Sequence, residues 1–230
     1  MAKSSAKKIQ RRLASPIWAI RNSPDARREA ILREAAGCFN RQGYHGTTIE
    51  DIANRLHVTK AALYHYIANK EEILFECHKL ALDLGMEGLR RADVQGGAPD
   101  ERLEIALRHY IEGMTNTLSG TVVLLEEGML TPKHYKDVVA RRDQFERKIR
   151  ALVQAGIAEG IFVQRNPKLV VFAMLGAANW ISKWYSPEGE LTASEIATGF
   201  VDYLLSGLRA STVRAESRKR GSTSLALHRP

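Results

Sequence analysis

The amino-acid sequence predicts an all-α fold, and two observations carry this prediction. Apolar residues recur at spacings of three to four along almost the whole chain, which is the period of one face of a helix. No long run alternates Val, Ile or Thr with polar residues, as a half-exposed strand would. With 230 residues, 44% of them hydrophobic, the chain can bury a substantial core, which excludes disorder throughout.

Capping residues mark where the helices begin. Ser23, Thr131 and Asn166 each stand before a proline, which is favoured at the first helical position because its missing N–H needs no partner there. A glutamate follows three residues after each of three further capping side chains, the spacing of a capping box: Thr47, Asn69 and Thr192. These signals predict about nine helices, over residues 24–41, 48–55, 59–66, 70–92, 100–118, 121–129, 132–158, 167–185 and 193–209.

The basic residues gather at the two ends of the chain. The whole chain has a formal charge of +8, and residues 1–22 carry six basic residues and no acidic one. The last 17 residues, 214–230, carry five basic residues and one acidic one. Each end is therefore expected to be a flexible basic segment that adds salt-sensitive attraction to a polyanion, without selecting a sequence.

Several functional classes find no support in the sequence. Cys38 and Cys77 lie in helical patterns without the spacing of a zinc site or a disulfide framework, which favours a reduced, cytoplasmic location. No apolar run is long enough for a membrane span, and the basic N-terminus has no apolar signal region. No phosphate-binding glycine loop, HExxH motif or nucleophile elbow occurs. We therefore expect neither an enzyme nor a bound metal or cofactor.

Residues 48–67 have the organisation of a helix-turn-helix. Two short helices, 48–55 and 59–66, are separated by the three-residue turn Leu56-His57-Val58. On the second helix, helical spacing turns one set of residues inward: Leu63, Tyr66 and Ile67. It leaves another set facing outward, suited to the major groove of DNA: Lys60, Ala61, Tyr64 and His65. Three residues at helix N-termini are candidates for phosphate or groove contacts: Thr48, Thr59 and Lys70. The alternative is a helical hairpin whose polar face meets only water.

The segment from Gly43 to Leu74 resembles the DNA-binding domain of TetR-type transcriptional regulators. Its Gly-x-x-x-Thr-Thr entry, Leu-Tyr-x-Tyr helix and Asn-Lys-Glu-Glu exit occur in the order and at the spacing of that family, and the likeness covers residues 24–74. The resemblance implies a homodimer of all-α subunits whose outward residues on 59–66 face DNA, with Thr48 and Lys70 near phosphates. Ile67 departs from the family pattern, where an aromatic residue is common, and this concerns packing.

The last two predicted helices are apolar on more than one face. Helix 167–185 carries large apolar residues all the way around, and helix 193–209 has a double apolar stripe. Such helices must be covered on both sides, which pairing with the same helices of a second subunit would achieve. TetR-type regulators form dimers through their last two long helices. We therefore expect a homodimer through 167–185 and 193–209.

Arg142 is the most informative residue outside the DNA-binding part. At helical spacing it falls within the apolar stripe of helix 132–158, which includes Val138 and Phe145. A guanidinium directed at a core needs an anion. That anion is either a carboxylate of the preceding helix, Glu126 or Glu127, or an anionic ligand in an apolar cavity, assisted by further basic residues of the same region: Lys133, Arg141, Arg147 and Lys148.

A second resemblance concerns the ligand. The Arg-rich stretch from Arg141 to Glu146, together with the pattern Asn-Trp-x-x-x-Trp-Tyr-x-Pro-x-Gly that begins at Asn179, is similar to the TetR-type repressors that sense acyl-coenzyme A thioesters. The resemblance covers residues 120–208 and implies an effector with an apolar acyl group and a polyanionic end. The candidate ligand residues are Arg141, Arg142, Phe145, Lys148, Asn179, Trp180 and Trp184. The two tryptophans and Tyr185 are equally suited to the core or a dimer interface.

The sequence therefore predicts a dimeric repressor that binds a near-palindromic DNA operator and is released by a small molecule, with an acyl-CoA thioester as the expected effector. Two rivals remain: a sensor of a different apolar molecule on the same fold, and a protein that coats DNA without sequence preference. The expected organisation is a basic arm over 1–22, a DNA-binding domain over 23–69, a ligand-binding and dimerisation domain over 70–210, and a basic tail over 211–230.

Overall fold

The computed structural model describes residues 24–118, 128–186 and 188–210. Within these ranges the chain forms eight α-helices, one short 3-10 helix and no β-strand, which confirms the all-α prediction. The elements are α3 (Pro24–Gly46), α4 (Ile49–Arg55), α5 (Lys60–Leu63), α6 (Lys70–Gln95), α7 (Pro99–Leu118), α8 (Pro132–Ala158), α9 (Pro167–Trp180), η1 (Ile181–Lys183) and α10 (Ala193–Ser206). The predicted helix over 121–129 falls almost wholly outside the described residues.

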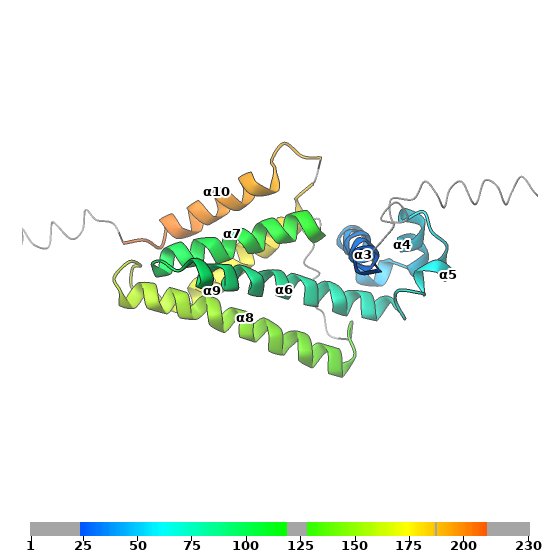
Figure 1. Ribbon diagram of the computed structural model, residues 1–230, viewed down its shortest axis with the longest axis horizontal. Coiled ribbons are helices and arrows are strands. Elements are labelled where there is room, and N and C mark those ends of the chain that lie inside the picture. Colours follow the sequence, from blue (N-terminus) through cyan, green and yellow to red (C-terminus); the bar gives the residue numbers. More distant parts are fainter. Residues whose placement is uncertain (1–23, 119–127, 187, 211–230) are drawn as a thin grey trace, which may run out of the picture.

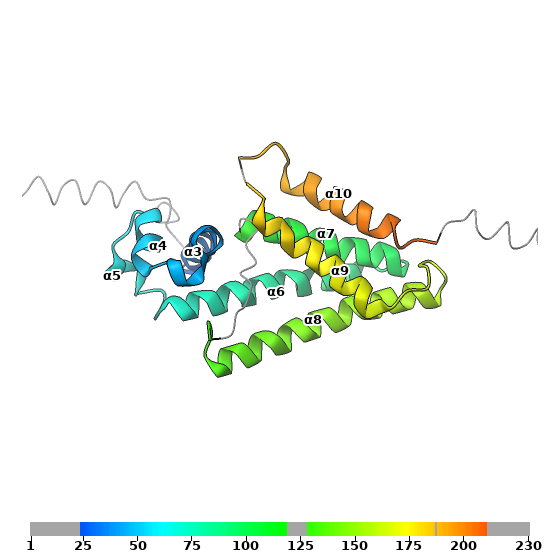
Figure 2. The ribbon, with the colours of Figure 1, turned by 180° about the vertical axis from the view of Figure 1, so that it is seen from behind.

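The helices form two groups, with α6 passing from one to the other (Figure 1). Helices α3, α4 and α5 gather at one end of the molecule, around the first turns of α6. The rest of α6 packs with α7, α8, α9 and α10 in an elongated bundle. In the reverse view α9 runs along the bundle between α8 and α10 (Figure 2). A movement of α6 within the bundle would therefore displace the small group at its N-terminal end.

The small group is built around a compact apolar core. Ile31 and Phe39 of α3, Ile52 of α4, and Leu63 and Ile67 around α5 are all buried. Two of these, Leu63 and Ile67, belong to the set that helical spacing turns inward. The third member, Tyr66, is half-buried and packs against the same core. The predicted inward face is therefore confirmed.

The helix caps largely follow the sequence, with one shift of register. Thr48 rather than Thr47 caps α4, because its hydroxyl accepts the amide of Asp51 at 3.1 Å while the Asp51 carboxylate accepts the amide of Thr48 at 2.8 Å. Thr47 is instead buried and donates its hydroxyl to the carbonyl of Gly43 at 2.8 Å. Four predicted side-chain caps are present: Asn69, Thr131, Asn166 and Thr192. Thr59, predicted inside its helix, instead caps α5, and the predicted cap Ser23 lies outside the described residues.

Several helix ends differ from the sequence prediction. Helix α6 runs to Gln95, past the predicted end at 92, and α10 ends at Ser206, before the predicted end at 209. The first helix continues to Gly46, across a break in helical geometry at Gly43, where a φ of 73° favours glycine. The predicted helix 59–66 ends at Leu63, since the amide of Tyr66 bonds in a tight turn to the Leu63 carbonyl. Helix α9 gives way to the 3-10 helix after Trp180.

Candidate nucleic-acid interface and interior cavity

The turn between α4 and α5 has a fixed backbone geometry. His57 takes a φ of 53°, uncommon for a residue other than glycine, and the amide of Val58 bonds to the carbonyl of Ala53 at 2.9 Å. Leu56 at the start of the turn is buried in the shared core. The turn therefore holds α5 across α4 in the arrangement of a helix-turn-helix.

Four side chains on and just after α5 face solvent, as the sequence predicts: Lys60, Ala61, Tyr64 and His65. Tyr64 is 46% exposed although it is a large aromatic residue. Together they offer a cation, a small residue that permits close approach, and two rings with hydrogen-bonding atoms. Such an outward face can approach base edges, while the opposite face is anchored by Leu63.

The three residues predicted at helix N-termini have internal partners. Thr48 directs its hydroxyl and amide to Asp51, and the hydroxyl of Thr59 accepts the amide of Ala62 at 3.2 Å. The ammonium of Lys70 donates to the carbonyls of Tyr44 at 2.9 Å and Thr47 at 2.8 Å, at the end of α3. Burial lowers the pKa of Lys70. All three side chains thus stabilise the local fold that presents the outward face.

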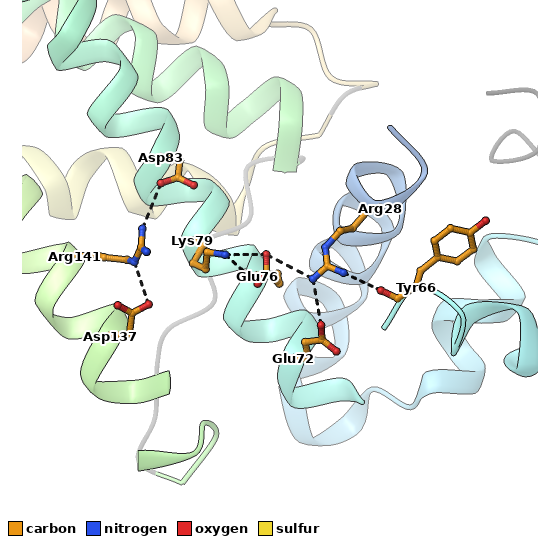
Figure 3. A network of polar contacts seen from close by, with 8 residues as sticks. All are labelled: Arg28, Tyr66, Glu72, Glu76, Lys79, Asp83, Asp137 and Arg141. Carbon is orange, nitrogen blue, oxygen red and sulfur yellow. Dashed lines mark hydrogen bonds and ion pairs between the residues drawn. The ribbon is translucent and has the colours of Figure 1, made fainter. Parts of the chain in front are cut away.

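Arg28 of α3 joins the helix-turn-helix to α6 (Figure 3). Its guanidinium donates to the carbonyl of Tyr66 at 2.8 Å, and lies 3.2 Å from Glu72 and 3.7 Å from Glu76. Lys79 adds an ion pair to Glu76 at 3.1 Å. One guanidinium thereby connects three segments, so a displacement of α6 carries over to the segment that follows α5.

A second junction connects the first turn of α6 with the first turn of α8. The carboxylate of Glu71 accepts the amide of Thr131 at 2.9 Å and lies 2.8 Å from Nδ1 of His134. The His134 ring stacks on Phe75, with 3.9 Å between ring centroids. Burial alone would raise the pKa of Glu71, but the bonds from Thr131 and His134 outweigh it, and the pKa is lowered. We call these four residues the α6–α8 junction.

The bundle contains a cavity of about 760 Å³ between α6, α7, α8 and α9. Its apolar lining consists of Ala81, Leu82, Tyr110, Val138, Phe145, Phe172 and Leu175. Its polar lining consists of His78, Arg142, Asp143, Glu146, Arg147, Arg150, Lys168 and Asn179. Tyr110 and Phe145 are buried, whereas Arg142, Asp143, Arg147 and Lys168 are exposed. The cavity therefore has an apolar interior and a rim on which three cations outnumber one carboxylate.

Arg142 lies at the cavity, but not in the way the sequence suggests. The apolar stripe of α8 is real, since Val138 and Phe145 are buried. The guanidinium side chain is nevertheless exposed, because the stripe at this position borders an open cavity rather than packed side chains. Among the described residues Arg142 has no ion pair, and the alternative partners Glu126 and Glu127 lie outside them. The expectation of a guanidinium directed into the core is therefore wrong.

The other predicted ligand residues divide into two sets. Phe145 and Asn179 line the cavity. Arg141 is held between Asp137 at 3.0 Å and Asp83 at 3.7 Å (Figure 3). It is not among the residues that line the cavity. Lys148 borders a separate groove beside α6. Trp180 and Trp184 are also absent from the cavity lining, and are 63% and 46% exposed.

Two residues at the cavity, the half-buried His78 and the buried Tyr110, belong to no motif that would single them out in the sequence. Burial, reinforced by the charge of Arg142, lowers the pKa of His78 to about 4. Its Nε2 is buried without a hydrogen-bond partner among the described residues. Burial raises the pKa of Tyr110, whose hydroxyl donates to Oδ1 of Asn179 at 2.8 Å. The cavity thus has polar atoms inside as well as at its rim.

Several large apolar side chains on or beside α9 and α10 are exposed: Leu169, Phe172, Trp180, Trp184 and Tyr203. Phe172 also borders the cavity, and Trp184 follows the 3-10 helix. Tyr203 is the most exposed, at 82%. A surface with this many exposed large apolar groups is typical of a protein–protein interface.

Neither a metal-binding cluster nor a membrane-spanning helix is present among the described residues. They contain no group of three or more His, Cys, Asp or Glu residues arranged to hold a metal ion. No helix among them is long and apolar enough to cross a membrane.

Comparison with known proteins assigns both helical parts. Residues 31–77 match the model of "Bacterial regulatory proteins, tetR family", and residues 96–208 match "Tetracyclin repressor-like, C-terminal domain". The HTH-type transcriptional repressor KstR2 of Mycolicibacterium smegmatis is 26% identical over 193 residues, which cover 83% of this chain and 94% of the relative.

Solved structures give the same assignment. PfmR of Thermus thermophilus, a TetR family transcriptional regulator, is 32% identical with a TM-score of 0.65, over 78% of this chain and 99% of that one. AibR, solved in complex with isovaleryl coenzyme A and operator DNA, is 33% identical with a TM-score of 0.63, over 77% of this chain and 97% of that one. These proteins regulate transcription and are not enzymes. This chain belongs to the TetR family of transcriptional regulators.

Proposed function

We propose that this chain is a dimeric repressor that binds a near-palindromic operator and leaves it when an acyl-CoA thioester enters the bundle cavity. One observation carries the proposal. A single cavity combines an apolar interior with the exposed cations Arg142, Arg147 and Lys168, and one of its walls is α6, the helix that leads to the helix-turn-helix. An apolar acyl group joined to a polyanionic nucleotide matches both requirements.

On DNA, each copy of α5 lies in a major groove of one half-site. Lys60, Tyr64 and His65 reach base edges or phosphates, and Ala61 allows the helix to approach closely. Thr48, Thr59 and Lys70 hold this surface in place, and their helix N-termini lie towards the DNA backbone. The basic segments at the ends of the chain add attraction that does not depend on sequence.

The dimer forms through α9 and α10. The exposed apolar side chains on this face, among them Trp180 and Tyr203, are covered by the same face of a second subunit. A change to Glu at either position should yield monomers in size-exclusion chromatography with light scattering. Unchanged dimers in both variants would place the interface elsewhere.

The effector acts through α6. His78 and Leu82 on α6 border the cavity, and nearer the start of the same helix Glu72 and Glu76 hold Arg28 of the small group. Occupancy of the cavity shifts α6, and Arg28 passes the shift to the segment after α5. The effector weakens DNA binding only to the extent that it binds the shifted state more tightly.

A similar protein also supports a CoA thioester as the effector. AibR, with 33% identity, has been solved with isovaleryl coenzyme A and operator DNA bound. That finding belongs to AibR, and it favours a CoA thioester over other apolar molecules as the effector class here. A protein of this class that acts on DNA in a bacterium works in the cytoplasm.

A panel of CoA thioesters, free CoA and the matching free acids tests the effector class by thermal melting of the full chain. A thioester at about one hundred times its Kd should raise Tm by ~5–10 °C through binding linkage. The same compound should release an operator selected from random duplexes in a gel-shift titration. Free acids that shift Tm while thioesters do not would favour a sensor of another apolar molecule, and DNA binding without sequence preference would favour the coating role.

A further inference from the structure

Two polar side chains inside the cavity are not accounted for by an anion at the rim. His78 lies on α6 and Asn179 on α9, so they reach the cavity from different helices. The apolar part of the same lining includes Leu82, Phe145 and Leu175. The phosphates of a nucleotide would be held by exposed cations, which leaves these two groups for the part of the effector that is buried.

His78 has a nitrogen that requires a partner. Its Nε2 is buried and makes no hydrogen bond within the described part of the chain. Burial and the neighbouring charge of Arg142 keep the pKa of His78 at about 4, so the ring is neutral at pH 7. A buried polar atom without a partner is rare in a folded protein and is often completed by a bound molecule.

Asn179 is oriented by a buried neighbour. The hydroxyl of Tyr110 donates to Oδ1 of Asn179 at 2.8 Å, and the Tyr110 ring packs against Phe145 with 5.2 Å between centroids. With its oxygen engaged, the amide retains the two N–H donors of Nδ2, for which the described residues supply no acceptor. These donors suit an oxygen atom of a molecule in the cavity.

We propose that the effector carries a hydroxyl or keto oxygen on its acyl group and that His78 and Asn179 bind this oxygen. The inference rests on the proposed function, since it names which acyl thioesters the cavity selects. A saturated acyl chain would fill the apolar space but bring no oxygen to Nε2 of His78 or Nδ2 of Asn179. A site built around hydrogen bonds rejects an analogue that lacks the bonding group much more strongly than an apolar site rejects a small change of shape.

The test uses pairs of thioesters that share the CoA and the thioester carbonyl and differ by one oxygen, such as 3-hydroxyoctanoyl-CoA and octanoyl-CoA. In the wild-type chain, titration calorimetry should show the oxygenated member binding about tenfold or more tightly. His78→Leu and Asn179→Leu should each remove most of this preference, while His78→Gln, which retains a nitrogen near the Nε2 position, should keep much of it. Equal binding of both members by the wild type would overturn the proposal.

Lys148→Ala is the matched control, since Lys148 lies on the same helix as Arg142 but outside the cavity lining. It should leave the preference unchanged. A preference that depends on Lys148 as strongly as on His78 would show that the oxygen is not read by the cavity, and would overturn the proposal.

A ligand-free measurement separates this inference from the effector class. If Nε2 of His78 is reserved for a ligand, His78→Leu should raise the Tm of the free protein by ~2–4 °C at pH 7, because an unpaired buried nitrogen is removed. A clear fall in Tm would show that His78 already has a structural partner, which overturns the proposal. If no thioester binds the wild type, the effector class is wrong. The same pairs offered as free acids then decide whether the oxygen is selected.

Discussion

Polar side chains around the helix-turn-helix have partners within the protein, whereas two polar groups at the bundle cavity have none among the described residues. Around α4 and α5 the side chains of Thr48, Thr59 and Lys70 are all bonded internally, and what remains outward is a prepared surface. In the cavity Arg142 has no ion pair and Nε2 of His78 has no hydrogen bond among the described residues. The helix-turn-helix satisfies these polar groups without DNA, whereas the polar groups of the cavity gain partners only from a ligand.

This difference follows from what each region must do. A surface that reads DNA benefits from rigidity, since every group fixed beforehand reduces the entropy lost on binding. A cavity that switches the protein must instead bind its ligand better in one state than in the other. Unpaired polar groups raise the free energy of the empty cavity, so a ligand that pairs them favours whichever state keeps these groups in the cavity. Four measurements test whether the two regions differ in this way.

The largest expected effect is the pH dependence that His78 gives to the free protein. Its pKa falls from 6.5 to about 4 on folding, because burial and Arg142 disfavour the charged ring. A group whose pKa is depressed in this way leaves stability unaffected above its ordinary pKa. As the pH falls towards 4, the unfolded chain takes up a proton that the folded chain does not, and stability is lost.

Between about pH 7 and pH 5, His78 should therefore remove ~2 kcal/mol of stability from the wild type that His78→Leu retains. Urea denaturation of both proteins at the two pH values measures the difference. Arg142→Ala should reduce the pH dependence in part, since it removes the neighbouring charge. Parallel losses in wild type and His78→Leu would mean that the cavity interior is wetter than its geometry indicates.

The next effect concerns the outward face of α5. Lys60→Ala and Tyr64→Ala should each weaken operator binding by ~1–3 kcal/mol while Tm stays within about a degree, because both side chains are exposed. Fluorescence anisotropy at fixed salt measures the affinity. As a control, Arg90→Ala removes an exposed ion pair with Glu87 on the far part of α6, and should change neither quantity. Wild-type operator affinity in both α5 variants would remove that helix from the interface.

Substitution of Arg142 at the cavity rim should have a smaller effect, and the affected quantity is the affinity for the thioester. Arg142→Ala should weaken thioester binding about tenfold, equivalent to ~1.4 kcal/mol, with little change in Tm or in operator affinity without ligand. Because the side chain is exposed and unpaired, its removal leaves no stranded carboxylate among the described residues. A large drop in Tm would instead indicate that Arg142 supports the fold through the segment outside the described residues, where Glu126 and Glu127 lie.

The two regions also differ in how far the sequence predicts them. The inward position of Leu63 and the outward position of Lys60 follow from helical spacing and a three-residue turn, both local in sequence. For Arg142 the same spacing identifies the correct face of α8, yet it cannot show that the neighbouring helices leave a cavity there. His78 and Tyr110 acquire their roles from packing among α6, α7 and α8, so no local pattern marks them.

Helix ends and the positions of aromatic residues are also only partly predictable from local sequence. The sequence predicts a helix over 59–66, longer than α5, because local spacing does not reveal that Tyr66 closes a turn onto Leu63. Trp180 and Trp184 belong to the sequence pattern that resembles thioester-sensing regulators, but both are exposed and lie outside the cavity lining. That position suits the dimer interface, the alternative that the sequence also allowed.

The smallest expected effect comes from the α6–α8 junction. It tests whether this junction only stabilises the fold or also transmits the effector signal. Glu71→Gln weakens the bonds from Thr131 and His134, and should lower the free energy of unfolding by ~1 kcal/mol at pH 7. The pKa of Glu71 lies below its usual 4.5 in the folded chain, so this contribution is present above pH 4.5 and is lost as the pH falls through the lower, folded value. The difference in free energy of unfolding between wild type and variant should therefore narrow below about pH 4.

The same variant separates a structural role of the junction from a role in signalling. If the junction only stabilises the fold, effector and operator affinities will each stay near wild type. If it transmits the signal, the variant will bind thioester normally yet keep more operator bound at saturating ligand. Glu76→Gln, which weakens the contact to Arg28 on the same helix, provides the comparison, because transmission through α6 alone would make that variant the less responsive of the two.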